Sequence, residues 1–233
     1  MNEDYFILNN ECSLDVGIVV VELPSITIPK QRIEEETVLG MDGVLTITDG
    51  TYEPTIKQCK VYYTGENIDS LCNYLKDGPV IFSNLPDRYY NAKIVSEIPI
   101  NYLFKNNDYG SWYEFTISFR CQPFGYSTDN EVLIITSKDS EVYNYCSYYS
   151  KPVITIYGSG HINLFIGNTQ ITLKDVDEYI TINSVKMRTY KDSQRQNDKK
   201  IGDFPNLNPG SNNITWDGNV SKIEIIPNFR YLV

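Results

Sequence analysis

The chain has 233 residues, of which 21% are charged and 41% are hydrophobic, and its formal net charge at pH 7 is −10. This length suffices to bury one large core or two smaller cores. An acidic chain does not offer the basic surface with which proteins bind phosphates, so the charge disfavours nucleic-acid binding and we expect no sequence-specific binding of nucleic acid. It leaves open an acidic channel through which nucleic acid passes without adhering. Tyrosine is frequent, with 19 residues, and it favours both strands and protein contact surfaces.

The cysteines indicate neither a metal site nor a disulfide framework. They are odd in number, contain no Cys-x-x-Cys pair, and lie at positions 12, 59, 72, 121 and 146. We interpret them as small buried apolar residues of a protein kept in a reducing cytoplasm. The N-terminus has neither the positive nor the apolar region of a signal peptide. The longest apolar run, 16–23, is too short to span a bilayer, so we expect no membrane insertion.

Strand patterns dominate the first half of the chain. Short apolar runs rich in β-branched residues, and alternating runs such as 55–64, are typical of strands. Glycine-bounded turns, including Gly-Met-Asp-Gly at 40–43, favour antiparallel pairing. The predicted strands are 5–8, 17–21, 44–48, 55–64, 80–82, 89–98 and 112–121, with a loop at 106–110 between the last two.

One helix is predicted over 67–76. Asn67 is suited to the N-cap, and the Gly-Pro pair at 78–79 ends the helix. Its apolar residues fall at i, i+3, i+4 and i+7, which places them on a single stripe: Ile68, Leu71, Cys72 and Leu75. A single helix among so many strands indicates a mainly β fold.

A domain boundary is predicted at 122–130, where Pro, Gly and small polar residues appear without periodicity. Beyond it, the spacing of short strands suggests a β-sandwich or jelly roll. These strands are predicted at 131–136, 152–157, 162–166, 170–173, 179–182 and 186–190, with turns at 158–160 and 167–168 and an exposed loop at 191–200.

The end of the chain is predicted to form a hairpin at 209–226. Ile214 and Trp216 share one face of its first strand, because side chains alternate with period two. The Asp-Gly pair at 217–218 has the chemistry of a turn. The returning strand is supplied by Val220, Ile223 and Ile225.

No pattern for catalysis, a cofactor or a metal is present in the sequence. The single histidine, His161, stands near Ser159 on a predicted turn, where sequence neighbours rarely aim at each other, so we interpret it as a surface residue. One histidine without paired cysteines does not make a zinc site. The acidic residues at 175–178 lack the spacing of a calcium loop. The consecutive acids at 34–36 point in different directions and cannot form a catalytic pair.

Several short motifs, taken in order, resemble those of the distal tail (Dit) proteins of tailed bacteriophages. The first is Pro-Ser-Ile-Thr-Ile-Pro at 24–29, followed by Arg32, an acidic stretch and the Gly-Met-Asp-Gly turn. An aromatic-rich strand then runs into Arg-Cys-Gln-Pro-Phe-Gly-Tyr at 120–126. In the second half, Phe-Pro at 204–205 and the segment 209–229 also match. The resemblance spans nearly the whole chain, and none of its motifs is catalytic.

The resemblance implies a mainly β chain with two domains. Residues 1–128 would form an N-terminal split-barrel-like β domain with one helix, the belt domain, and residues 129–233 a C-terminal galectin-like β-sandwich. The belt domain would close into a homo-hexameric ring, or two stacked rings, at the virion tail tip. The ring would join the tail tube protein to the tail-associated or baseplate hub protein, help to carry the receptor-binding protein, and let DNA pass through its lumen. Assembly would take place in the host bacterial cytoplasm.

The sequence therefore predicts a structural virion protein without enzyme activity. The acidic residues expected to line the ring lumen or the ring interface are Glu34, Glu35, Glu36 and Asp42. The alternative is a carbohydrate-binding module involved in host-surface attachment, with Trp216, Tyr148 and Tyr149 as sugar-stacking candidates. The alternation of Trp216 with Ile214 favours core packing of this tryptophan instead. A hydrolase subunit is the third hypothesis.

Overall fold

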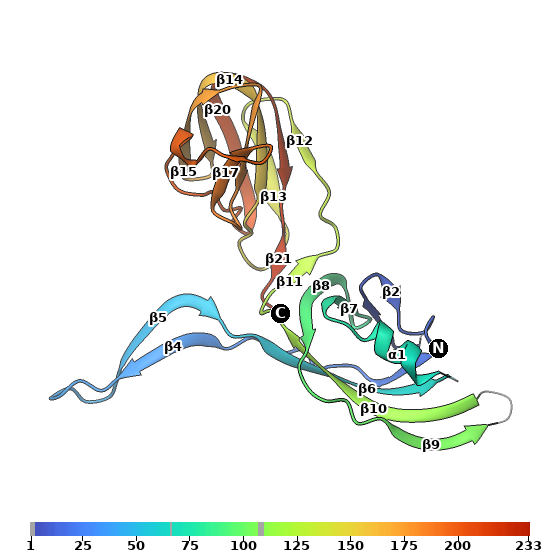
Figure 1. Ribbon diagram of the computed structural model, residues 1–233. Helices are drawn as coiled ribbons and strands as arrows, with labels where there is room; N and C mark the ends of the chain where they lie inside the picture. Colours follow the sequence, from blue (N-terminus) through green and yellow to red (C-terminus); the bar gives the residue numbers. More distant parts are fainter. Residues whose placement is uncertain (1–2, 66, 107–109) are drawn as a thin grey trace. The chain divides into compact units, whose positions relative to one another are not determined.

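The computed structural model describes residues 3–65, 67–106 and 110–233 (Figure 1). The chain is mainly β, as predicted, and it divides into two compact units. Unit 1 comprises Met1–Gly125 together with Leu232–Val233, and unit 2 comprises Tyr126–Tyr231. The division falls inside the segment 122–130, although the last two residues of the chain group with unit 1.

Unit 1 is built on an antiparallel sheet whose strands lie in the order β2-β1-β7-β8-β10-β6-β3, with β9 also paired to β10. Strands β6 and β10 pair along the whole length of β6, and alternate residues of both strands point into one apolar core. The bounds are β1 (Phe6–Leu8), β2 (Glu11–Cys12), β3 (Ile18–Glu22), β6 (Thr55–Thr64), β7 (Gly78–Phe82), β8 (Leu85–Ile94), β9 (Asn101–Asn106) and β10 (Gly110–Cys121).

The helix α1 (Ile68–Tyr74) packs on this core. Asn67 is its N-cap, as predicted, and its side chain accepts a hydrogen bond of 2.9 Å from the backbone N–H two residues further on. The predicted apolar stripe is wrong in one position, because Cys72 is exposed and Tyr74 is buried instead. The ring of Tyr74 can enter the core because its hydroxyl donates a hydrogen bond of 3.1 Å to the backbone oxygen of Glu11.

Strands β4 (Gln31–Glu36) and β5 (Leu45–Tyr52) form a separate two-stranded ribbon (Figure 1). Strand β4 was not predicted, because its sequence shows no alternation of apolar and polar residues, and neither of its faces is buried. The predicted Gly-Met-Asp-Gly turn lies between the two strands, with Gly40 and Gly43 at φ values of 83° and 87°. Every residue from 30 to 51 is exposed, and we call this segment the arm.

Unit 2 is a β-sandwich built around two long strands, β14 (Val153–Ile166) and β20 (Gly210–Ile226), which pair with each other antiparallel. The first part of β14 also pairs with β16 and its last part with β15, while β12 and β13 pair with opposite parts of β20. The inward side chains of both parts join one core, so the long ladder supplies both layers of the sandwich. The other strands of the sandwich are β12 (Leu133–Ile135), β13 (Ser140–Asn144), β15 (Thr169–Val176), β16 (Tyr179–Asn183), β17 (Arg188–Lys191), β18 (Gln194–Arg195) and β19 (Lys200–Ile201). Two short strands outside it, β11 (Gly125–Ser127) and β21 (Arg230–Tyr231), pair with each other.

The predicted hairpin at 209–226 is wrong, because this segment contains a single strand, β20. Gly218 has a φ of 108°, and a Cβ at this position would lie 2.4 Å from the carbonyl oxygen of His161 on β14. Because glycine has no Cβ, the backbones of β14 and β20 can approach closely at Gly218. The pairing is irregular at this point, but the chain continues in the same direction and does not turn back. The register of β14 shifts at the same level, so the predicted turn at 158–160 is also part of a strand.

Two other strands carried too little pattern to be predicted. In β9, consecutive residues such as Tyr102, Leu103 and Phe104 are exposed, so burial imposes no alternation on the strand. In β13, alternate residues are buried, but the polar Asn144 lies inside and Tyr143 lies outside, so apolar and polar residues do not alternate in the sequence. The segment 191–200, predicted to be an exposed loop, contains β18 and a 3-10 turn (Asn197–Lys199). The predicted loop at 106–110 lies largely outside the described residues.

Replacing Gly218 by Ala is expected to destabilise unit 2, because the new Cβ meets the His161 carbonyl oxygen and the backbone is held at a positive φ. Gly160→Ala is the matched control, since Gly160 also has a positive φ of 76° but a Cβ there would meet nothing within 4 Å. We expect Gly218→Ala to cost about 1–3 kcal/mol more than the control, measured by urea unfolding. Equal losses would show that the close approach of the strands does not require this glycine.

Candidate interaction site

The structure gives no support to a catalytic role for the single histidine. His161 is exposed on β14, and the Ser159 hydroxyl accepts a hydrogen bond of 2.8 Å from the side chain of Asn219 on β20. That serine is therefore engaged across the strand pair. Within residues 3–65, 67–106 and 110–233, no group of three or more His, Cys, Asp or Glu side chains is placed to hold a metal ion. None of the helices in these ranges has the length and apolar character needed to cross a membrane.

The acidic residues near position 177 are engaged by a lysine. Lys191 Nζ lies 3.1 Å from a carboxylate oxygen of Asp177 and 3.1 Å from one of Glu178. These two carboxylates, which both point into solvent, therefore have a cation from their own chain as a partner.

Burial shifts the pKa of several titratable groups of unit 1 in the direction that favours the neutral form. Burial raises the pKa of the Cys59 and Cys121 thiols to about 12, so neither forms the thiolate that a nucleophile needs. Lys57 lies on the inward side of β6, and burial lowers the pKa of its ammonium group. Its Nζ lies 4.7 Å from the centroid of the Tyr90 ring, which offers a cation–π contact.

The three candidate sugar-stacking residues do not form one exposed aromatic platform on which a sugar ring could stack. Trp216 is only 4% exposed and shares the buried side of β20 with Ile214. Tyr148 and Tyr149 are half-buried, and their ring centroids lie 4.7 Å apart. The guanidinium of Arg230 lies over both rings, at 5.2 and 4.7 Å from their centroids. The two tyrosine rings thus pack against each other and a cation within unit 2.

All four acidic residues expected at the lumen or ring interface lie on the arm and are exposed. Glu34 and Glu36 share one face of β4, while Glu35 lies on the opposite face, because side chains alternate along a strand. Asp42 lies in the turn between β4 and β5. The structure therefore brings these residues onto one ribbon, but it does not place them on a single face.

The arm also carries an unusual number of exposed apolar side chains. Leu45 and Ile47 are 43% and 44% exposed, and their cross-strand partners are Glu36 and Glu34. The other large exposed apolar side chains on the arm are Ile33, Val38, Leu39, Met41 and Val44. A single chain leaves these apolar side chains in water, and exposed apolar surface of this kind is typical of interaction sites.

A second exposed apolar surface of unit 1 lies on the hairpin of β9 and β10, and we call it the aromatic row. Tyr102 and Phe104 of β9 are both more than half exposed. Phe104 stacks on Trp112 of β10 with ring centroids 5.8 Å apart and an interplanar angle of 14°. Tyr102 meets Tyr113 edge to face at 5.6 Å. This surface could not be predicted from the sequence, because the pattern of β9 did not identify it as a strand.

The fold of the whole chain is similar to that of a solved phage protein. The match is the crystal structure of the SPP1 Dit (gp 19.1) protein, described as a paradigm of the hub adsorption apparatus in phages that infect Gram-positive hosts. The TM-score is 0.71 and the sequence identity 14%, and the alignment covers 96% of this chain and 98% of that one. The chain thus has a Dit-like fold, as its motifs predicted. No protein-family model and no curated protein sequence matches it.

The exposed histidine supplies a test of the hydrolase hypothesis. His161→Ala is expected to leave the free energy of unfolding within about 0.5 kcal/mol of the original protein, as for other exposed positions without a structural role. In a cell-wall zymogram, we expect neither protein to produce a cleared band. A cleared band that disappears in the folded His161→Ala variant would establish a catalytic histidine.

Proposed function

We propose that this chain is a structural protein of a bacteriophage tail, a distal tail hub without enzyme activity. The observation that carries the proposal is the Dit-like fold, which extends over 96% of the chain. In this role, the protein joins the tail tube protein to the tail-associated or baseplate hub protein at the virion tail tip. It also helps to carry the receptor-binding protein. Assembly takes place in the host bacterial cytoplasm.

Unit 1 is the ring-forming part in this proposal. A closed ring needs head-to-tail contacts, in which two different surfaces of each copy meet. Unit 1 offers two such surfaces, the arm and the aromatic row. If the arm of one copy covers the aromatic row of the next, the apolar side chains on both surfaces leave water. Repetition of that contact closes a homo-hexamer, which can stack as two rings.

The acidic arm residues would keep transiting DNA from adhering to the ring. Glu34 and Glu36 share a face with Leu45 and Ile47, whereas Glu35 lies on the other face. When the apolar face contacts a neighbouring copy, Glu35 is the residue of this acidic run that is left to face the lumen. Repulsion between carboxylates and phosphates is long-ranged at low salt and is screened at higher salt.

The arm supplies a direct test of assembly. We expect the original protein to form particles of about six or twelve chains in light scattering coupled to gel filtration, as ring closure requires. Ile47→Glu places a charge on the apolar face of the arm and is expected to shift the protein to monomers. Its unfolding free energy should stay within about 0.5 kcal/mol, because the site is exposed in the single chain.

Thr46→Glu is the matched control, because Thr46 is the neighbouring residue on the opposite face of the arm. It introduces the same charge and is expected to preserve the oligomer. A protein that stays monomeric at all concentrations, alone and with a tail tube protein, would contradict the proposed ring. Equal loss of assembly in both variants would show that the contact between copies does not depend on the face of the arm that carries Leu45 and Ile47.

The lumen assignment is tested by charge reversal on an assembled ring. Glu35→Lys is expected to make the ring retain double-stranded DNA in a gel-shift assay at about 50 mM salt and to release it at about 200 mM salt. Asp203→Lys, an exposed position in unit 2, makes the same change in charge and is expected to leave the ring without DNA. Retention by both variants would show that net charge, and not position in the lumen, controls adhesion.

A further inference from the structure

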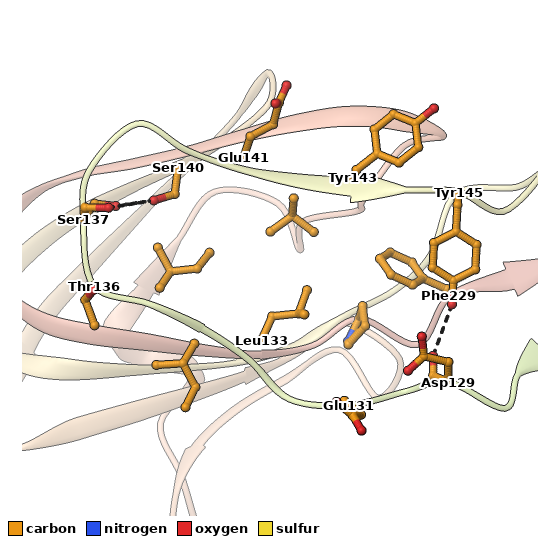
Figure 2. Close-up of a pocket in the computed structure, with 14 residues that line it drawn as sticks. Asp129, Glu131, Leu133, Thr136, Ser137, Ser140, Glu141, Tyr143, Tyr145 and Phe229 are labelled. Atoms are coloured by element: carbon orange, nitrogen blue, oxygen red, sulfur yellow. Dashed lines mark hydrogen bonds between the residues drawn. The ribbon is translucent and has the colours of Figure 1, made fainter.

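Unit 2 contains a cleft of about 660 Å³ between strands β12 and β13 (Figure 2). Figure 2 shows Leu133 and Tyr143 on opposite sides of it. The turn that carries Ser137 closes one end, where the Ser140 hydroxyl donates a hydrogen bond of 2.7 Å to the Ser137 carbonyl oxygen. The other end is bordered by Tyr145, whose hydroxyl donates to the carbonyl oxygen of Asp129 at 3.3 Å.

The cleft has an apolar floor and partly apolar walls. Ile135, Val142 and Phe229 line it and belong to the core of the sandwich. Ile134 and Tyr143 line it too, yet they are 64% and 66% exposed. An occupant could therefore gain apolar contacts here without any rearrangement of the core.

The charged side chains that line the cleft are all acidic. Asp129, Glu131 and Glu141 line it, and the described residues that line it include no lysine or arginine. Lys138, in the turn between the two strands, has an ion pair with Asp217 of β20 at 3.9 Å. An occupant of this cleft is favoured if it carries positive charge.

The strands on both sides of the cleft are edge strands. Among the described residues, β12 and β13 each pair with β20 alone. An edge strand has backbone N–H and C=O groups on its open side, and these can pair with an added extended segment. Both borders of the cleft thus offer main-chain pairing, and the side chains offer apolar and anionic contacts.

We propose that this cleft binds an extended, basic peptide segment of another protein, which pairs as an added strand with the edge of β12 or β13. Apolar side chains of the segment face the floor of the cleft, and its lysine or arginine side chains meet Glu131 and Glu141. The identification of the other protein as a tail component rests on the proposed function. The peptide-binding chemistry of the cleft does not rest on it.

The proposal is tested with the full chain on an array of random peptides of about eight residues, a length that extends beyond either strand. We expect the bound peptides to be enriched in Lys and Arg, to alternate with apolar residues, and to lack internal proline. Glu131→Lys/Glu141→Lys should weaken the strongest peptides by about tenfold or more in fluorescence anisotropy. Asp198→Lys/Asp203→Lys makes the same change in net charge on exposed residues outside the cleft and should leave affinity unchanged.

Hydrogen exchange of the complex should show new protection of amides in β12 or β13. Absence of bound peptides, a bound set without basic enrichment, or equal weakening by both double variants would overturn the proposal. Binding of neutral oligosaccharides that is lost in Tyr143→Ala, without peptide binding, would overturn it in favour of a sugar site. If peptides bind as expected while no ring forms, the tail-hub function fails and the peptide site stands.

Discussion

The antiparallel ladder between β14 and β20 is the interaction on which unit 2 depends. Each strand is long enough to serve both layers of the sandwich, and the remaining strands of the sandwich pair around them. The ladder tolerates its change of register because Gly218 permits a backbone approach that a Cβ would block. The same arrangement leaves β12 and β13 as edges on either side of a cleft, so one pairing of two long strands produces both the core and an open cleft at its edge.

Unit 1 combines a closed apolar core with an arm whose apolar side chains are exposed. Its core is closed by β6, β10 and the helix α1, and burial keeps the Cys59 and Cys121 thiols in their protonated form. The arm, by contrast, leaves Leu45, Ile47 and other apolar side chains in water. Apolar surface of this kind is stabilised when another surface covers it.

Most strands that bury the side chains of one face in a core were predicted from the sequence. The run Thr55–Thr64 alternates because the core of unit 1 takes every second side chain, and its predicted bounds agree with β6. Asn67 was recognisable as an N-cap because capping is a local interaction within a few residues. The short motifs that resemble distal tail proteins predicted the Dit-like fold, although no single one of them was specific.

By itself, then, the sequence determined the mainly β class and the position of the helix α1 with its N-cap, Asn67. Both depend on composition, on alternation of apolar residues and on local hydrogen bonds, which a sequence displays directly. Only the tertiary structure decided that 209–226 contains one strand and not a hairpin. An Asp-Gly pair has the local chemistry of a turn, and the long-range pairing of β20 with β14 overrode it. The arm, the aromatic row and the cleft were likewise decided by pairing between distant strands. The sequences of β4, β9 and β13 lack a regular alternation of apolar and polar residues, and the pairing partners of the predicted strands β5 and β12 lie elsewhere in the chain, where local sequence does not specify them.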